Sequence, residues 1–116
     1  MRSAGRLRFQ LKMIRGGFMI PNKVNVAGIE YEIEEVENVI IDGSVNYAGS
    51  CSYVESKIQI LKDLAPTKKE QVFIHELLHA CFFEAGFGDH DEDIVNRVGI
   101  VLYQVLKNND LSFAKS

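Results

Sequence analysis

The chain has 116 residues, of which 47% are hydrophobic and 25% are charged, and it contains no tryptophan. This length and composition predict one small soluble domain with a single hydrophobic core. Five of the 13 basic side chains lie in residues 1–18, which contain no acidic residue, so the remaining body is acidic. An acidic body argues against nucleic acid as a partner, and no apolar run is long enough to span a membrane.

The composition of the N-terminal segment predicts a domain boundary between residues 18 and 19. We expect residues 1–18 to be a basic arm, either flexible or not native, and residues 19–116 to be the domain itself. Basic residues interrupt the apolar stretch of the arm, and no small-residue cleavage site follows, so the arm is not a signal peptide. The native start is then either Met1 or Met19. We expect the two cysteines to be reduced thiols in a cytoplasmic protein.

Residues 23–36 predict a β-hairpin. Val24 and Val26 alternate with polar residues before a turn at Ala27-Gly28, and the following segment alternates apolar residues with glutamates. One face of this hairpin is therefore apolar and the other is acidic.

A short apolar run and two further strands are expected before the helices begin. Residues 38–41 form a short apolar run that ends at an Asp-Gly turn signal. Residues 45–54 predict a strand in which Gly49 allows a bulge or a close backbone approach. Residues 57–61 predict the last strand, with its two isoleucines on one face.

The periodicity then becomes helical. Thr67 and Glu70 have the spacing of a capping box, and a nearly all-apolar helical pattern extends to Ala85, where glycines end it. A helix that is apolar all round is buried. A second helix, from about residue 90 to residue 107, is expected to fold back beside the first. Its expected core stripe is Ile94, Val95, Val98, Val101, Leu102 and Val105.

The predicted fold class is therefore α+β. We expect a small antiparallel β-sheet of three to four strands, then the buried helix, then the second helix packed antiparallel to it.

The first helix contains the sequence His75-Glu76-Leu77-Leu78-His79. Positions i and i+4 share one face of a helix, so both imidazoles can reach one zinc ion, while Glu76 can hold a water molecule on that metal. This is the H-E-x-x-H arrangement of zinc metallopeptidases. The alternative is a metal-free core helix, which requires a separate buried partner for each ring and for the carboxylate.

A catalytic zinc site needs a third protein ligand and one open position. In metzincins the third histidine follows the second by six residues, and Ala85 occupies that position here, which excludes that arrangement. The sequence leaves four candidates, His90, Asp91, Glu92 and Asp93. Glu92 is favoured because its side chain is long and lies on the side of the second helix near Val95. The acidic candidates have a second explanation, since carboxylates also stabilise a helix N-terminus.

Two segments carry a resemblance to a known family. His75-Glu76-Leu77-Leu78-His79-Ala80 is similar to the zinc helix of the ImmA/IrrE-type metallopeptidases, and residues 92–99 resemble their third-ligand helix. Residues 20–110 also resemble small zincin-like proteins encoded by bacteriophages and prophages. The resemblance implies a gluzincin-like site with two histidines and one glutamate as zinc ligands, and a phage or prophage origin.

The expected function is a zinc metallopeptidase in which Glu76 acts as general base on a zinc-bound water. Its partner would be a peptide or protein substrate, bound as an added strand at an edge formed by residues 57–61. Three tyrosines remain open as oxyanion donors, Tyr47, Tyr53 and Tyr103. The alternatives are a catalytically silent zinc-binding structural or interaction protein, and a zinc hydrolase of another bond.

Overall fold

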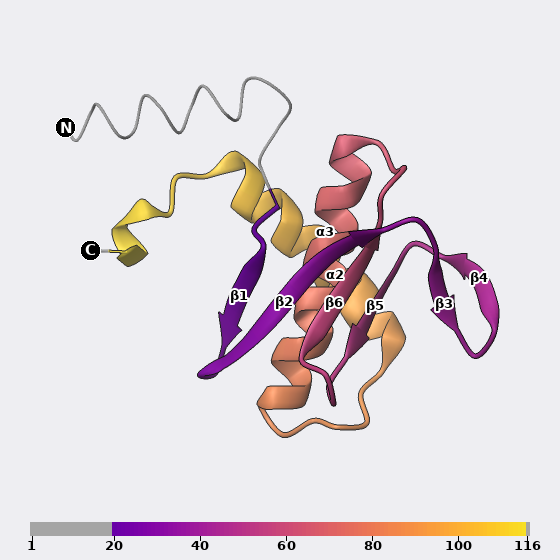
Figure 1. The fold of residues 1–116 in the computed structure, drawn as a ribbon. Coiled ribbons are helices and arrows are strands. Elements are labelled where there is room, and N and C mark those ends of the chain that lie inside the picture. Colours follow the sequence, from indigo (N-terminus) through magenta and orange to yellow (C-terminus); the bar gives the residue numbers. More distant parts are fainter. Residues whose placement is uncertain (1–19, 116) are drawn as a thin grey trace.

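The computed structural model describes residues 20–115, so the arm expected at residues 1–18 and the choice between Met1 and Met19 lie outside them. Within this range the chain forms an α+β fold, as predicted, with the strands first and the helices after them (Figure 1). The strands are β1 (Lys23–Val26), β2 (Ile29–Val36), β3 (Val39–Ile41), β4 (Ser44–Tyr47), β5 (Gly49–Ser52) and β6 (Lys57–Leu61). The helices are α2 (Pro66–Glu84), α3 (Glu92–Asn108) and the short 3-10 helix η1 (Ser112–Lys115).

The main sheet has the strand order β1-β2-β6-β5, and β3 and β4 form a separate two-stranded hairpin. β1 and β2 form the predicted antiparallel hairpin, and β5 and β6 are also antiparallel. β2 and β6 are parallel, so the sheet is mixed and the expectation of a wholly antiparallel sheet was wrong. The chain leaves β2, forms the β3–β4 hairpin and then β5, and so enters β6 in the direction of β2.

The strand predicted at residues 45–54 is two strands, β4 and β5, separated at Ala48. The last predicted strand, β6, is present but lies between β2 and β5, so its expected place at an edge was wrong. The alternation of Ile58 and Ile60 reflects core packing, because both side chains are fully buried. Among the described strands, β5 forms the edge on this side of the sheet.

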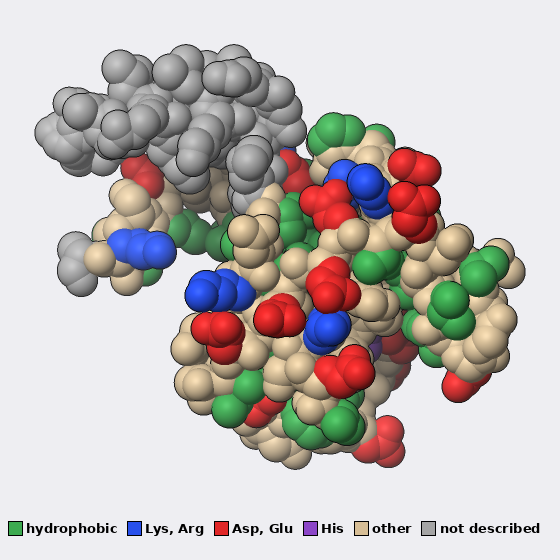
Figure 2. All heavy atoms as spheres, viewed as in Figure 1, with side chains coloured by type: hydrophobic (Ala, Val, Ile, Leu, Met, Phe, Trp, Pro, Cys, Tyr) green, Lys and Arg blue, Asp and Glu red, His purple; other side chains and the backbone are tan. Residues whose placement is uncertain are grey.

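One face of the sheet carries the helices, and no described helix covers the other face (Figure 1). α2 packs against β5 and β6, and α3 packs against α2. On the uncovered face, acidic and basic side chains lie side by side (Figure 2), with ion pairs from Lys23 to Glu30 and from Lys57 to Glu34. The core between sheet and α2 consists of Val26, Tyr31, Ile58, Ile60, Val72, Phe73, Ile74 and Ala80.

The start of α2 differs from the predicted capping box. Ala65 is the N-cap residue, Pro66 opens the helix, and no side chain caps it. Glu70 is buried and turns to α3 instead, where its carboxylate accepts hydrogen bonds from the Tyr103 hydroxyl at 2.5 Å and the Lys107 ammonium at 2.7 Å. A buried carboxylate needs such partners, and this need outweighs the local capping preference.

α3 follows its prediction in position but not in its buried face. Val95 and Gly99 are its buried residues, whereas Ile94, Val98 and Val101 of the expected core stripe are exposed. The contact with α2 runs along the side that carries Gly99, which lies close to Leu78 and the backbone of His75. Neither α2 nor α3 is long and apolar enough to cross a membrane.

Gly49 provides the close backbone approach that the sequence allows for. A Cβ atom at this position would lie 2.5 Å from Cγ1 of Val72 and 3.2 Å from Cγ of Glu76. β5 can therefore lie directly against α2 only because residue 49 has no side chain.

We expect Gly49→Ala to lower the free energy of unfolding by about 1–3 kcal/mol, because a methyl group would overpack the β5–α2 contact. Chemical denaturation measures this. The control is Gly88→Ala, where a Cβ meets no atom within 4 Å. That variant should be unchanged, or more stable by about 0.4–1 kcal/mol. Equal stabilities of the two variants would contradict the packing argument.

Candidate metal centre

His75 and His79 project from one face of α2, as the i, i+4 spacing requires. Their ring centroids are 4.9 Å apart, and both side chains are half-buried. Burial lowers the pKa of His79, the neighbouring histidines lower it further, and the Glu92 carboxylate opposes the shift. A neutral imidazole is the form that binds a metal.

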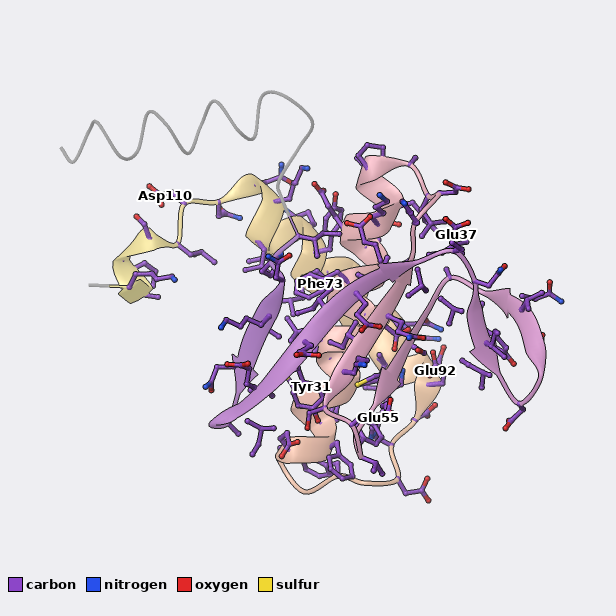
Figure 3. The ribbon with its side chains drawn as sticks, viewed as in Figure 1. Tyr31, Glu37, Glu55, Phe73, Glu92 and Asp110 are labelled. Atoms are coloured by element: carbon purple, nitrogen blue, oxygen red, sulfur yellow. The ribbon has the colours of Figure 1, made fainter. Side chains whose placement is uncertain are left out.

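Glu92, labelled in Figure 3, is the first residue of α3 and lines the same groove as β5. Its carboxylate faces both rings, with Oε2 at 2.8 Å from Nε2 of His75 and Oε1 at 3.0 Å from Nε2 of His79. One possible ligand atom from each of the three residues lies within 4.8 Å of the other two. Of the four candidates for a third ligand, Glu92 is the one that the structure brings to both histidines.

The other three candidates have different contacts. The Asp91 side chain caps α3 by accepting a hydrogen bond from the backbone N–H of Asp93. Asp93 forms an exposed ion pair with Arg97. His90 lies behind the site, with its Nε2 atom 2.8 Å from Nδ1 of His79. No pattern in the sequence indicates this contact, because residue 90 lies in the loop between the helices.

This group fits a zinc ion by donor chemistry and by spacing. Two imidazole nitrogens and one carboxylate are a ligand set of catalytic zinc sites. Ligand atoms about 2.0–2.2 Å from a tetrahedral zinc ion are about 3.3–3.6 Å from one another. The nitrogen–oxygen distances of 2.8 and 3.0 Å are a few tenths of an ångström shorter, so small side-chain movements would admit the ion.

Glu76 lies next to this group and is 8% exposed. Burial raises the pKa of its carboxyl group to about 8, and the charge of Glu92 adds to this shift. Among residues 20–115, no lysine or arginine forms an ion pair with it. A carboxylate without a cationic partner, with a pKa close to neutrality, is suited to accept and return a proton.

The site opens into a groove of about 1060 Å³. α2 and α3 form one wall with His75, Glu76 and Glu92, and β5 and the β3–β4 hairpin form the other. Apolar side chains line both walls of the groove, from the β3–β4 hairpin on one side and from Ile100 of α3 on the other. This volume is large enough to hold several residues of an extended peptide.

The edge of β5 along this groove has main-chain groups that do not pair with β6. Leu61 N–H donates to the Ala48 carbonyl at 2.8 Å, and in an antiparallel ladder alternate residues bond to the partner strand. Ser50 and Ser52 therefore pair with β6, and the main-chain groups of Gly49 and Cys51 point away from it. Within the described sheet, no further strand lies next to β5.

The three tyrosines considered as oxyanion donors lie in different places. The Tyr103 hydroxyl donates to Glu70, on the side of α2 that contacts the end of α3. Tyr47 and Tyr53 line the groove. The Tyr53 ring stacks on Phe83 with a centroid distance of 4.2 Å, which fixes its position. Both cysteines are free thiols.

Comparison with protein family models, with curated proteins and with solved structures finds no match for this chain.

The raised pKa of Glu76 predicts a pH-dependent stability of the metal-free protein. Between the ordinary value of 4.5 and about 8, the folded protein keeps a proton that the unfolded chain has lost. The free energy of unfolding should therefore fall as the pH rises through this window, by an amount on the order of a few kcal/mol. Denaturation of chelator-treated protein between pH 5 and pH 9 measures the slope.

Glu76→Gln should flatten this slope, because the amide does not titrate. Glu55→Gln is the control, since Glu55 is an exposed carboxylate that lines the same groove. An identical slope in the wild-type protein and in Glu76→Gln would contradict the assignment.

Proposed function

We propose that this protein is a zinc-dependent peptidase with His75, His79 and Glu92 as the metal ligands. The observation that carries the proposal is the convergence of two Nε2 atoms on one carboxylate, beside a buried glutamate, at the wall of an open groove. Contacts of 2.8 and 3.0 Å between imidazole nitrogens and a carboxylate need either a proton on each nitrogen or a cation between the groups, and one zinc ion can take the place of both protons. The spacing in the H-E-x-x-H helix supports zinc as that cation.

The chemistry follows from the positions of the side chains. Bound zinc would supply a Lewis acid that polarises a substrate carbonyl and lowers the pKa of water. Glu76 takes a proton from the attacking water and later passes it to the leaving amine nitrogen. Its burial beside Gly49 holds the carboxylate in one position, because β5 closes one side of the residue.

The substrate would be a peptide in extended conformation along β5. The outward main-chain groups of Gly49 and Cys51 can pair with it as an added strand. This edge replaces residues 57–61, which lie inside the sheet. Apolar side chains of the substrate would contact the β3–β4 hairpin and Ile100 across the groove. The free thiols Cys51 and Cys81 are consistent with our assignment of the protein to the cytoplasm.

Protein purified without chelators should contain about one zinc ion per chain, as a single three-ligand site requires. His79→Ala and Glu92→Gln should each remove most of this zinc, because each variant takes away one of three donors. Elemental analysis after desalting measures the ratio. Asp93→Asn is the control, since Asp93 is next to Glu92 and pairs with Arg97 instead. Wild-type protein without zinc would refute the proposed site.

Glu76→Gln should keep the zinc and lower kcat for peptide hydrolysis by about 10²–10⁴-fold, the usual contribution of a general base. The assay is cleavage of a peptide library by the wild-type protein and the variant, each with and without a chelator, read by mass spectrometry. Hydrolysis that survives in Glu76→Gln would contradict the assigned base. A wild-type protein that holds zinc and cleaves nothing would be the catalytically silent zinc-binding protein.

A further inference from the structure

We infer that His90 is a positioning residue for the metal centre: it fixes the ring orientation and the tautomer of His79 and thereby sets the affinity for zinc. This inference rests on the proposed function. Its basis is a chain of two short contacts behind the site. Nδ1 of His79 lies 2.8 Å from Nε2 of His90, and Nδ1 of His90 lies 2.6 Å from the carbonyl oxygen of Phe87.

The direction of these hydrogen bonds follows from the last partner. A backbone carbonyl only accepts, so Nδ1 of His90 carries a hydrogen and donates it to Phe87. Nε2 of a neutral His90 is then an acceptor, and it receives the N–H of Nδ1 of His79. His79 is left with an unprotonated Nε2 atom on the side that faces Glu92. One carbonyl oxygen therefore selects the tautomer of His79 that can bind a metal.

Aromatic rings around His90 hold it in place. Phe82 stacks on its ring with a centroid distance of 5.3 Å and an interplanar angle of 22°. Tyr53 meets it edge-on at 6.4 Å, and the Tyr53 hydroxyl lies 3.4 Å from Nε2. Both neighbours are themselves fixed, because Phe82 contacts Phe87 and Tyr53 stacks on Phe83.

The end of α2 places the acceptor carbonyl. Gly86 adopts a left-handed conformation with φ +102°, and the N–H of Phe87 donates to the carbonyl of Phe82 at 2.9 Å. The N–H of Gly86 donates to the carbonyl of Phe83 at 3.0 Å, which completes a Schellman turn. This turn fixes the backbone of Phe87 against the helix, and with it the oxygen that His90 bonds.

Two amide substitutions distinguish a role of His90 in positioning the His79 ring from a role in packing between its aromatic neighbours. In His90→Gln the longer side chain brings a carbonyl oxygen near the place of Nε2, so the contact with His79 can form. In His90→Asn the amide reaches only the place of Nδ1, so the bond to Phe87 is kept and the contact with His79 is lost. His90→Phe keeps an aromatic ring between its neighbours and removes both hydrogen bonds.

The experiment is competition of each full-length variant with a chromophoric chelator for zinc, together with thermal unfolding of the metal-free proteins. We expect His90→Asn and His90→Phe to weaken zinc binding by about 10–100-fold, the usual effect of removing an outer-shell partner. His90→Gln should recover most of this loss. Asp89→Asn, in the same loop, is the control and should bind zinc as the wild-type protein does.

A second readout reports on the geometry of the site. In cobalt-substituted protein, the visible absorption bands should shift in His90→Asn and return towards the wild-type position in His90→Gln. Equal zinc affinities of His90→Asn, His90→Gln and the wild-type protein would overturn the inference alone. A wild-type protein that binds no zinc would overturn both the inference and the proposed function. Zinc binding with these affinity differences but without peptide hydrolysis would leave His90 in its role and refute the peptidase.

Discussion

The meeting of one carboxylate from α3 with two imidazoles from α2 is the contact on which the rest of the structure depends. It requires α3 to begin beside the middle of α2, which the turn at Gly86 and the short loop after it make possible. It also requires close packing of the two helices, and Gly99 provides this near His75. The sheet contributes from the other side, because Gly49 brings β5 against Glu76. The groove is the space that these close approaches leave open.

α2 carries two buried carboxylates, and their surroundings give them opposite properties. Glu70 accepts hydrogen bonds from Tyr103 and Lys107, so its charge is compensated and it joins α2 to α3. Burial raises the pKa of Glu76, and the negative charge of Glu92 nearby raises it further. No cation among the described residues pairs with this carboxylate to oppose the shift. An uncompensated carboxylate costs stability, and proteins retain such a group where it can transfer a proton. The contrast within one helix supports the assignment of Glu76 as the base.

Much of the local structure was predictable from the sequence, and the pairing of strands was not. The alternation in residues 23–36 and the apolar pattern of α2 gave the first hairpin and the central helix, because each depends on neighbouring residues. The alternation of Ile58 and Ile60 is the same for an edge strand and an internal strand, so the sequence did not show that β6 lies inside a mixed sheet. The capping box predicted at Glu70 is absent for a similar reason, since the hydrogen-bond partners of this residue lie on another helix.

For the site, the sequence favoured Glu92 by side-chain length, and the structure brings this residue to the histidines. The contact of His90 depends on the shape of a loop, which no periodicity describes.

α3 is attached to the domain by few buried groups, and this has a consequence for cooperativity. Val95 and Gly99 are its buried residues, and Leu102 and Tyr103 pack partly buried against the core. Polar contacts hold its two ends, through Glu92 at the start and through Tyr103 and Lys107 near the end. A helix with so little buried apolar surface opens at a lower free energy than the sheet and α2, so amide hydrogen exchange should be faster there. A metal ion bound between α2 and Glu92 would raise this opening energy by RT ln(1 + [L]/Kd). In the proposed peptidase the same ligand set would therefore have a catalytic role and a thermodynamic one, since a metal bound there would also couple α3 to the unfolding of the whole domain.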